Sequence, residues 1–554
     1  MIKSKQHEEV QNTAAQAFLR GPLRPLWLRN LKRAPRPKPP LRVPSCPLWL
    51  RVCLCLGLVF CISCSSRPDP NTLVMVIEQS PSNLDPRVGT DSQSERIAGL
   101  IFDSLVRKDD HFNLQPWVAE KWEMRDPQTY VFTLRQGIHF HDGRPLTSRD
   151  VKWTLDSLTN GSVVSLRAAA YRHVIKVEAP DDATLIVHLS EPDATLLWNL
   201  SDGAFGIVPY GSGGKELSRK PIGSGPFKFL QLDPDNQVLL DRNDNFWATP
   251  PKIAHVRFNI VPDATTRALE LRKGSADIAA TNSISADLVK TLRRDQKLEV
   301  LQQPGTSLVY VAFNLRDPIL KDVRVRQALA YAVDRQPMLT ALVGGFGRLA
   351  DSVLPPQHWA YNGNVAHYEH SVEKANALLD QAGFPRGQDG TRFHLTMKTS
   401  TEEASRLIAA VLQQQLRQVG IALDLRSFEF ATFYSDIIKG EFQMYSLRWV
   451  AGSNQDPDIF EYVFHSSSFP PKRANRSYYS NPRVDQLIDA GRHTVDQAER
   501  KRLYGEVQEI LARDLPYLDF WYMDNLTVHT NRLRDLKIGV AANYDFLAEV
   551  ALAR

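Results

Sequence analysis

Short apolar runs alternate with amphipathic stretches along most of the chain. Residues 72–77 (TLVMVI) and 129–134 (TYVFTL) are rich in β-branched and aromatic residues, which is typical of strands buried in a sheet. The second run leads through an Asp-Gly turn to Thr147, which is placed to cap a helix over 151–155. These patterns predict strands and helices in alternation.

The second half of the chain contains three amphipathic stretches with helix-forming residues. We expect helices over 324–333, over 372–382 with Gly383 closing it, and over 496–512, followed by Pro516 and an aromatic strand at 517–522. Mixed strands and helices over about 480 residues predict an α/β fold, and two lobes around a cleft are a common way to enclose a ligand.

An apolar run at 52–62 follows a basic stretch and ends in small residues, which is the pattern of a secretory signal. It is shorter than the roughly 20 residues that a membrane-spanning helix needs. Its end, Cys61-Ile-Ser-Cys64, resembles a bacterial lipobox, which implies lipidation of Cys64 and a membrane anchor. Cys61 stands where Leu or Val is usual, so a signal cleaved without lipidation and an uncleaved anchor stay open. We assign 1–64 to a basic leader and lipoprotein signal.

Charge is distributed unevenly between this leader and the rest of the chain. Residues 1–51 carry eleven Lys or Arg against two Glu, a net charge of +9, so the remainder carries −4 of the total of +5. Residues 1–45 either precede the true translation start or form a basic interaction arm. The mildly acidic remainder argues against nucleic acid as a partner. All five cysteines lie within 46–64, so the rest has no disulfide, thiolate metal site or cysteine nucleophile.

Several segments taken together resemble one family. They read WVAEKW (117–122), YVFTLRQGIHFHDGRPLT (130–147), GSGPF (223–227), NFW (245–247), LRKGSADI (271–278), FNL (313–315), DVRVRQALAYAVDR (322–335), ANALLDQAG (375–383) and YSNPRVD (479–485). In this order they resemble the extracellular solute-binding proteins of family 5 over residues 72–535. That family includes dipeptide-, oligopeptide- and nickel-binding proteins of ABC importers.

The resemblance implies a periplasmic binding protein fold of type II in its three-domain variant, with a hinge between lobes. Lobe I would comprise 71–108, 206–305 and 526–554, a small second domain 109–205, and lobe III 306–525. The implied protein is a lipid-anchored monomer in the bacterial periplasm, at the outer face of the cytoplasmic membrane. It would bind a peptide-like small solute without a cofactor or metal and deliver it to ABC permease subunits.

The segment from Arg448 to Asp458 is the candidate ligand-binding loop. In peptide-binding relatives a Trp, here Trp449, is followed by an Asp that pairs with the ligand's ammonium group. Gly452 occupies that place, so either Asp456 takes over the role or the ligand has no ammonium there. A third interpretation makes Asp456 the cap of a Pro-containing turn. We predict ligand contacts from Trp449, Arg448, Gly452, Ser453, Asn454 and Asp456.

Further candidates lie outside this loop. Thr90 stands where some relatives carry an acid, and Trp521 or Tyr522 corresponds to a late aromatic strand that lines the pocket, although a core role fits either aromatic equally. We predict structural ion pairs within a charged group on one helix, which comprises Arg324, Arg326, Asp334 and Arg335. The alternative is that one of these arginines faces the cleft.

Two histidine-containing motifs have spacings that metal sites also use. His139-Phe-His141-Asp142 is better explained as a strand before an Asp-Gly turn, and His367-Tyr-Glu-His370 as a surface loop. The chain lacks G-x-S-x-G, H-E-x-x-H and a Walker loop, so we predict a binding protein, with a secreted hydrolase as the opposing class. A metal chelate, an opine or an oligosaccharide remains as an alternative solute.

Overall fold

The computed structural model describes residues 70–201, 203, 205–449 and 456–553. The fold below is that of the unit formed by residues 67–554. Cys64 and the rest of the leader lie outside the described residues, as do Gly452, Ser453 and Asn454.

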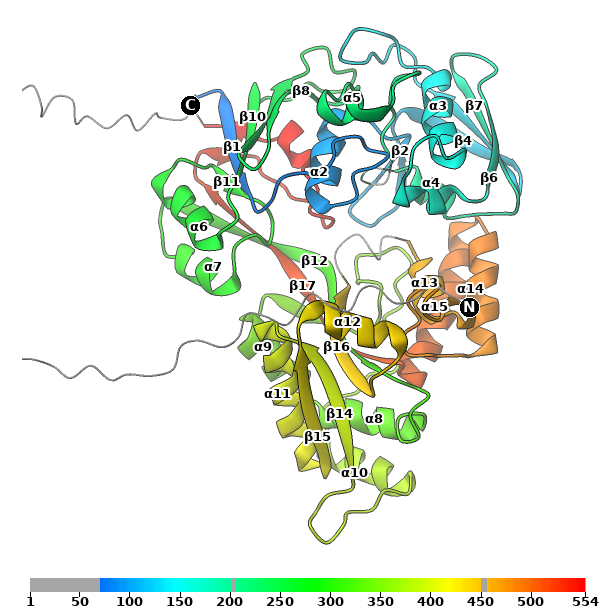
Figure 1. The fold of residues 1–554 in the computed structure, drawn as a ribbon, viewed down its shortest axis with the longest axis vertical. Helices are drawn as coiled ribbons and strands as arrows, with labels where there is room; N and C mark the ends of the chain where they lie inside the picture. The colour runs from blue at the N-terminus through cyan, green and yellow to red at the C-terminus, as the bar shows by residue number, and fades with distance from the viewer. Residues whose placement is uncertain (1–69, 202, 204, 450–455, 554) are drawn as a thin grey trace, which may run out of the picture. The chain divides into compact units, whose positions relative to one another are not determined.

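The largest sheet joins eleven strands of the described residues in the order β15-β14-β16-β12-β17-β11-β1-β10-β9-β8, with β13 paired to β17 at the side (Figure 1). Its strands are β1 (Thr72–Ile77), β8 (Phe227–Asp233), β9 (Gln237–Arg242), β10 (His255–Ile260), β11 (Ile278–Ala279), β12 (Leu298–Phe313), β13 (Gly347–Leu349), β14 (Phe393–Ser400), β15 (Ile421–Phe428), β16 (Met444–Trp449) and β17 (Tyr517–Thr530).

A second, antiparallel sheet has the order β4-β5-β7-β6. Its strands are β4 (Ala119–Asp126), β5 (Thr129–Leu134), β6 (Val174–Glu178) and β7 (Thr184–Leu189). Two short pairs complete the strands of the described chain: β2 (Val106–Lys108) with β3 (Leu114–Pro116), and β18 (Leu533–Arg534) with β19 (Ala551–Leu552).

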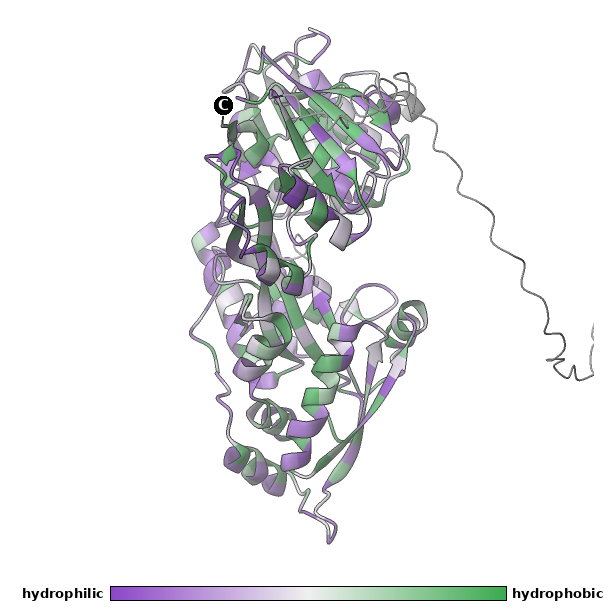
Figure 2. Cartoon of the chain, turned by 90° about the vertical axis from the view of Figure 1, so that its left-hand side faces the viewer, coloured by the Kyte–Doolittle hydropathy of each residue, from purple (hydrophilic) through white to green (hydrophobic). Residues whose placement is uncertain are grey.

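Helices cover the faces of these sheets. They are α2 (Ser92–Ile101), α3 (Ser148–Thr159), α4 (Leu196–Asn199), α5 (Gly214–Arg219), α6 (Ala264–Lys273), α7 (Ala286–Leu292), α8 (Val323–Ala332), α9 (Arg335–Val343), α10 (Val372–Gln381), α11 (Glu403–Gln418), α12 (Phe430–Lys439), α13 (Ile459–Phe464), α14 (Pro482–His493) and α15 (Gln497–Asp514), with 3₁₀ turns at Leu166–Tyr171, Ser466–Ser468 and Asp545–Ala548. Figure 2 shows helices that carry both hydrophobic and hydrophilic residues, as expected for amphipathic helices on a sheet.

Strands β12 and β17 are the long strands that join the two halves of the large sheet. Their antiparallel ladder runs from the Leu298–Thr530 pair to the Ala312–Tyr517 pair, with one irregularity between Val309 and Tyr310 and another between Gln303 and Ser307. Gly305 lies in that irregularity, and a Cβ atom there would stand 2.3 Å from the carbonyl oxygen of Met523. Only glycine permits this close approach of the two backbones.

The hydrophobic cores follow this division of the sheets. Two clusters occupy the two faces of the sheet around β12, β14, β16 and β17, two more lie around β1, β10 and β11, and a fifth covers the four-stranded sheet. These cores lie largely within the ranges that we predicted for lobe III, lobe I and the second domain. The domain boundaries themselves stay a prediction, because β12 and β17 run through them without a break.

The elements predicted from the hydrophobic pattern are confirmed. Strand β1 has the predicted bounds and all six residues are buried, and β5 also has its predicted bounds. Thr147 is the N-cap of α3, where the Asp150 carboxylate accepts a hydrogen bond from the Thr147 backbone N–H at 2.8 Å. The aromatic strand after Pro516 is longer than predicted, because its second half pairs with β11 and β12.

Candidate ligand-binding site

Strand β16 places Trp449 at its last position, directly before the segment 450–455. Side chains alternate along the strand, so Tyr445 and Trp449 lie on one face with Tyr310, while Met444 packs in the core on the opposite face. Arg448 is exposed and, by the same alternation, lies on the face opposite Trp449. Its predicted ligand contact stays a prediction.

Trp449 is half-buried in a group of aromatic rings. Its ring stacks on Tyr310, with centroids 6.1 Å apart and planes 12° apart, and Tyr310 in turn stacks on Tyr517 at 4.3 Å. Tyr462 meets the indole edge-on at 6.2 Å. The indole Nε1 is buried without a hydrogen-bond partner among the described residues. Trp449 is therefore held in position and has an N–H group left to donate.

Arg476 lies beside Trp449 and was missed by sequence reasoning. It is only 7% exposed, and its Cζ lies 5.5 Å from the centroid of the Trp449 ring. Its guanidinium donates to the hydroxyl of Tyr434 at 2.8 Å. In the sequence Arg476 is a single basic residue between Asn475 and Ser477, a context typical of a solvated loop, so nothing in the pattern marks it.

Asp456, at the other end of the candidate loop, already has partners. Its Oδ1 accepts a hydrogen bond from the Asp458 backbone N–H at 2.8 Å, which fixes the turn before α13. Both carboxylate oxygens lie 3.2 Å from Nη2 of Arg500, a side chain with no exposed surface. Burial raises the pKa of Asp456, and the Arg500 charge opposes that rise. An ammonium-binding role of Asp456 stays a prediction.

Arg500 is enclosed by aromatic rings as well as by Asp456. Its Cζ lies 4.7 Å from the ring centroid of Trp198, 5.4 Å from that of Trp359 and 5.6 Å from that of Tyr504. Trp198 belongs to α4, in the range predicted for the second domain, whereas the other residues belong to that of lobe III. The pair thus lies where two parts of the chain meet.

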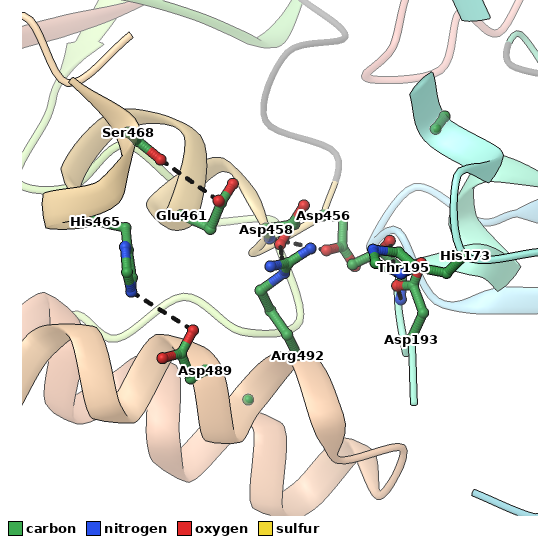
Figure 3. Close-up of polar contacts among 12 residues, drawn as sticks. His173, Asp193, Thr195, Asp456, Asp458, Glu461, His465, Ser468, Asp489 and Arg492 are labelled. Carbon is green, nitrogen blue, oxygen red and sulfur yellow. Dashed lines mark hydrogen bonds and ion pairs between the residues drawn. The ribbon is translucent and has the colours of Figure 1, made fainter. Parts of the chain in front are cut away.

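A second set of polar contacts lies next to this pair (Figure 3). Arg492 of α14 places its Nε 2.7 Å from Oδ1 of Asp458, and its backbone carbonyl accepts a hydrogen bond from the N–H of Ala194 at 3.0 Å. Asp193 caps the turn before α4 by accepting from the Thr195 hydroxyl at 2.7 Å. The C-terminal end of α14 therefore contacts both the start of α13 and the segment that leads into α4.

The remaining candidates lie in different environments. Thr90 is exposed in the turn before α2. Trp521 and Tyr522 are fully buried on opposite faces of β17, one in each core, and the Tyr522 hydroxyl lies 2.5 Å from the carbonyl oxygen of Ser352. Their role in lining the pocket stays a prediction. Asp519, on the same strand, is half-buried with its Oδ1 atom buried and unpartnered among the described residues, and burial raises its pKa to about 7.

The arginines around α8 follow the predicted ion pairing only in part. Arg324 pairs with Asp322 at 2.6 Å and Arg335 with Asp351 at 3.3 Å. The prediction is wrong for Arg326, which is buried and donates to the backbone carbonyls of Leu320, Lys321, Asp514 and Leu515. Carbonyl oxygens stabilise this cation where an acid was expected.

Histidines of both motifs contact neighbouring backbone or side-chain groups. His141 Nε2 lies 3.0 Å from the carbonyl oxygen of Gly225, and Gly143 has the positive φ of the predicted turn. His367 is half-exposed near Asp351. Within the described ranges no group of three or more His, Cys, Asp or Glu is arranged to hold a metal ion, and no helix there is long and apolar enough to cross a membrane.

The two-lobed α/β architecture and the family resemblance are both borne out by comparison with known proteins. Residues 113–470 match the bacterial extracellular solute-binding proteins, family 5 (middle region), and the chain belongs to this family. Members of the family are binding proteins, and the relatives are periplasmic binding proteins.

Individual relatives cover most of the chain. The dipeptide-binding protein of Escherichia coli is 28% identical over 81% of this chain and 88% of its own length, and heme-binding protein A of Haemophilus influenzae is 28% identical over 81% and 86%. The oligopeptide-binding protein AppA of Bacillus subtilis, solved in complex with a nonapeptide, is 26% identical over 87% of this chain and 99% of that one, with a TM-score of 0.68.

Proposed function

We propose that this protein is the substrate-binding subunit of an ABC importer that captures a peptide-like solute between lobes I and III and delivers it to a transmembrane permease. The observation that carries the proposal is the similarity to a dipeptide-binding protein over 81% of the chain, together with the fold shared with a protein solved with a bound nonapeptide.

The arrangement of β12 and β17 supports a capture mechanism. Two strands are the long connection between the halves of the large sheet, and their ladder is irregular at Gly305. Such a connection allows the lobes to rotate about a small number of residues and enclose a solute. Closure then distinguishes the loaded from the empty protein, which is what a permease must recognise.

Solute binding in this proposal involves no catalysis. Trp449 stacks against the solute, and the segment containing Gly452, Ser453 and Asn454 supplies polar contacts. The absence of a nucleophile or zinc motif from the sequence supports this, and turnover of chromogenic esters or peptides by the purified protein would contradict it. A metal chelate, an opine or an oligosaccharide is the alternative solute.

The same proposal places the protein in the periplasm as a monomer, held on the membrane through a lipidated Cys64. Metabolic labelling with a palmitate analogue tests the anchor. We expect label in the wild type and none in Cys64→Ser, whereas equal labelling of both would remove Cys64 as the attachment site.

The decisive experiment on function is mass spectrometry of the solute released from purified protein by unfolding. A pool of short peptides is the expected result. A metal chelate or a sugar as the released species would replace the peptide proposal by the alternative.

A further inference from the structure

Arg476 is a buried cation held in a fixed place. Its neighbours pin the backbone: the Asn475 side chain donates to the carbonyl oxygens of His465 and Tyr479 at 3.0 and 2.8 Å, and the carbonyl oxygen of Ser477 accepts from the Leu315 N–H at 3.0 Å. With 7% of its surface exposed, Arg476 differs from a surface arginine, which keeps its charged end in water.

The partners of Arg476 differ from those of the other buried arginines. Among the described residues, Arg87 and Arg500 pair with aspartates, and Arg267 and Arg326 donate to several backbone carbonyls. Arg476 forms no ion pair with a described carboxylate; its guanidinium donates to the neutral hydroxyl of Tyr434 and lies close to that of Tyr445. A guanidinium stays charged in proteins, and a buried charge without a counter-charge costs several kcal/mol.

The neighbouring segment 450–455 does not supply the missing acid. It reads Val-Ala-Gly-Ser-Asn-Gln, without a carboxylate. The nearest acid after it, Asp456, is paired with Arg500.

Other hydrogen-bond donors surround the guanidinium. Nε1 of Trp449 is buried without a hydrogen-bond partner among the described residues. The hydroxyls of Tyr445 and Tyr517 are also buried, within hydrogen-bonding reach of each other and of Tyr310. Burial raises the pKa of both tyrosines, and the charge of Arg476 opposes that rise, which is the effect of a cation close to both hydroxyls. The group therefore combines one fixed positive charge with three further N–H or O–H groups.

Such a set of donors matches an anion. A guanidinium forms two parallel hydrogen bonds to a carboxylate, the indole N–H donates to the same oxygens, and a tyrosine hydroxyl can rotate towards them. An ammonium group would be repelled here. We propose that Arg476, beside Trp449, binds a carboxylate of the captured solute, so that this end of the site selects anions. For a peptide solute this inference rests on the proposed function, and the carboxylate belongs either to the C-terminus or to an acidic side chain.

The test uses three libraries of synthetic peptides of two to five residues and the full protein freed of bound solute by unfolding and refolding. The first library has free C-terminal carboxylates and no Asp or Glu, the second has the same sequences as C-terminal amides, and the third is amidated but contains Asp or Glu. Peptides retained after gel filtration are counted by mass spectrometry. The variants are Arg476→Gln, Arg476→Lys and, as matched control, Arg406→Gln, which changes an exposed arginine of α11.

We expect the wild type and Arg406→Gln to retain free-acid peptides about tenfold or more over their amides, a ratio that corresponds to about 1.4 kcal/mol. Arg476→Gln should reduce the ratio to about one, and Arg476→Lys should restore part of it because the charge is kept. Retention of the third library by the wild type would assign the carboxylate to a side chain. Equal retention of all three libraries by a folded wild type and by Arg476→Gln would overturn the inference.

Failure of the proposed function gives a different result. If the wild type retains none of the three libraries, the peptide proposal is wrong. Carboxylate binding by Arg476 is then tested with the solute that copurifies from the expression host. A carboxylate-bearing solute that is present in the wild type and lost from Arg476→Gln supports it. An uncharged or cationic solute that both proteins carry overturns it.

Discussion

Replacing Arg500 by methionine should destabilise the protein through the charge that it leaves behind. The substitution removes the partner of Asp456, whose side chain is only 13% exposed, and also removes a cation from contact with three aromatic rings. Methionine keeps much of the volume, so the loss is mainly electrostatic.

The magnitude follows from the burial of the pair. Removing one partner of a buried ion pair costs about 3–5 kcal/mol. Unfolding entropy is about 2.1 cal/mol/K per residue, so a unit of about 490 residues has about 1 kcal/mol/K. The expected fall in Tm is therefore about 3–5 °C, if the unit unfolds in one transition.

The pH dependence separates charge from packing. In Arg500→Met the pKa of Asp456 loses the opposing effect of Arg500 and rises further above its ordinary value. A carboxyl whose pKa is raised in the folded state binds its proton more tightly there than in the unfolded chain, so stability is lost as the pH rises towards the folded-state pKa. The deficit of Arg500→Met should be smaller at pH 5 than at pH 8.

Differential scanning calorimetry of the wild type, Arg500→Met, Asp456→Asn and the double variant at both pH values measures these effects. The double variant should recover part of the loss, because no unpaired buried carboxylate remains. A change in Tm of under 1 °C for Arg500→Met, or a deficit that is the same at pH 5 and pH 8, would show that the pair does not stabilise the fold in this way.

Three further predictions concern single residues. Trp449→Ala should weaken solute binding about tenfold or more while lowering Tm by only a few degrees, since the indole is only half-buried. A collapsed Tm with unchanged affinity per folded molecule would make Trp449 a core residue. Burial raises the pKa of Asp519 from 3.8 to about 7, so the wild type should lose stability relative to Asp519→Asn as the pH rises from about 4 to about 7, by at most about 4 kcal/mol. Thermal unfolding of both proteins at pH 4.5 and 8 measures this loss, and an equal difference in stability at the two pH values would disprove it. Gly305→Ala should lower the free energy of unfolding in urea by about 1–3 kcal/mol, because its Cβ would overlap the carbonyl oxygen of Met523. The control Gly99→Ala, in a helix with free space around it, should be neutral or stabilising. Equal stabilities of the two variants would refute the close approach.

The sequence alone predicts the elements whose pattern is local. The apolar run of β1 and the Thr147 cap of α3 depend on neighbours within a few residues, so each is legible without the fold. The motifs that carry the family resemblance are mostly of this kind, and they add the two-lobed architecture. The irregular register of β12 on β17 depends on strands that are about 200 residues apart, and no local pattern encodes it.

The candidate site was predicted only in part for the same reason. Trp449 follows from the family motif and lies at the end of a strand, and its role in ligand binding stays a prediction. Arg500 lies 44 positions after Asp456, in a helix with many exposed charges, so its complete burial has no sequence signal. Arg476 is distinguished by having no ion pair with a described carboxylate, and this can be seen only when its neighbours in space are known.

The ladder between β12 and β17 also has a genetic consequence. Gln303 and Asn525 are cross-strand partners, so the stretch of about 220 residues between them leaves and re-enters the remainder at adjacent points. One continuous DNA segment encodes this stretch. If the stretch is removed, a two-residue turn is enough to rejoin the two strands. Recombination between relatives at these two points would exchange Trp449 and Arg476 as a unit and leave the leader and first strands of the recipient unchanged.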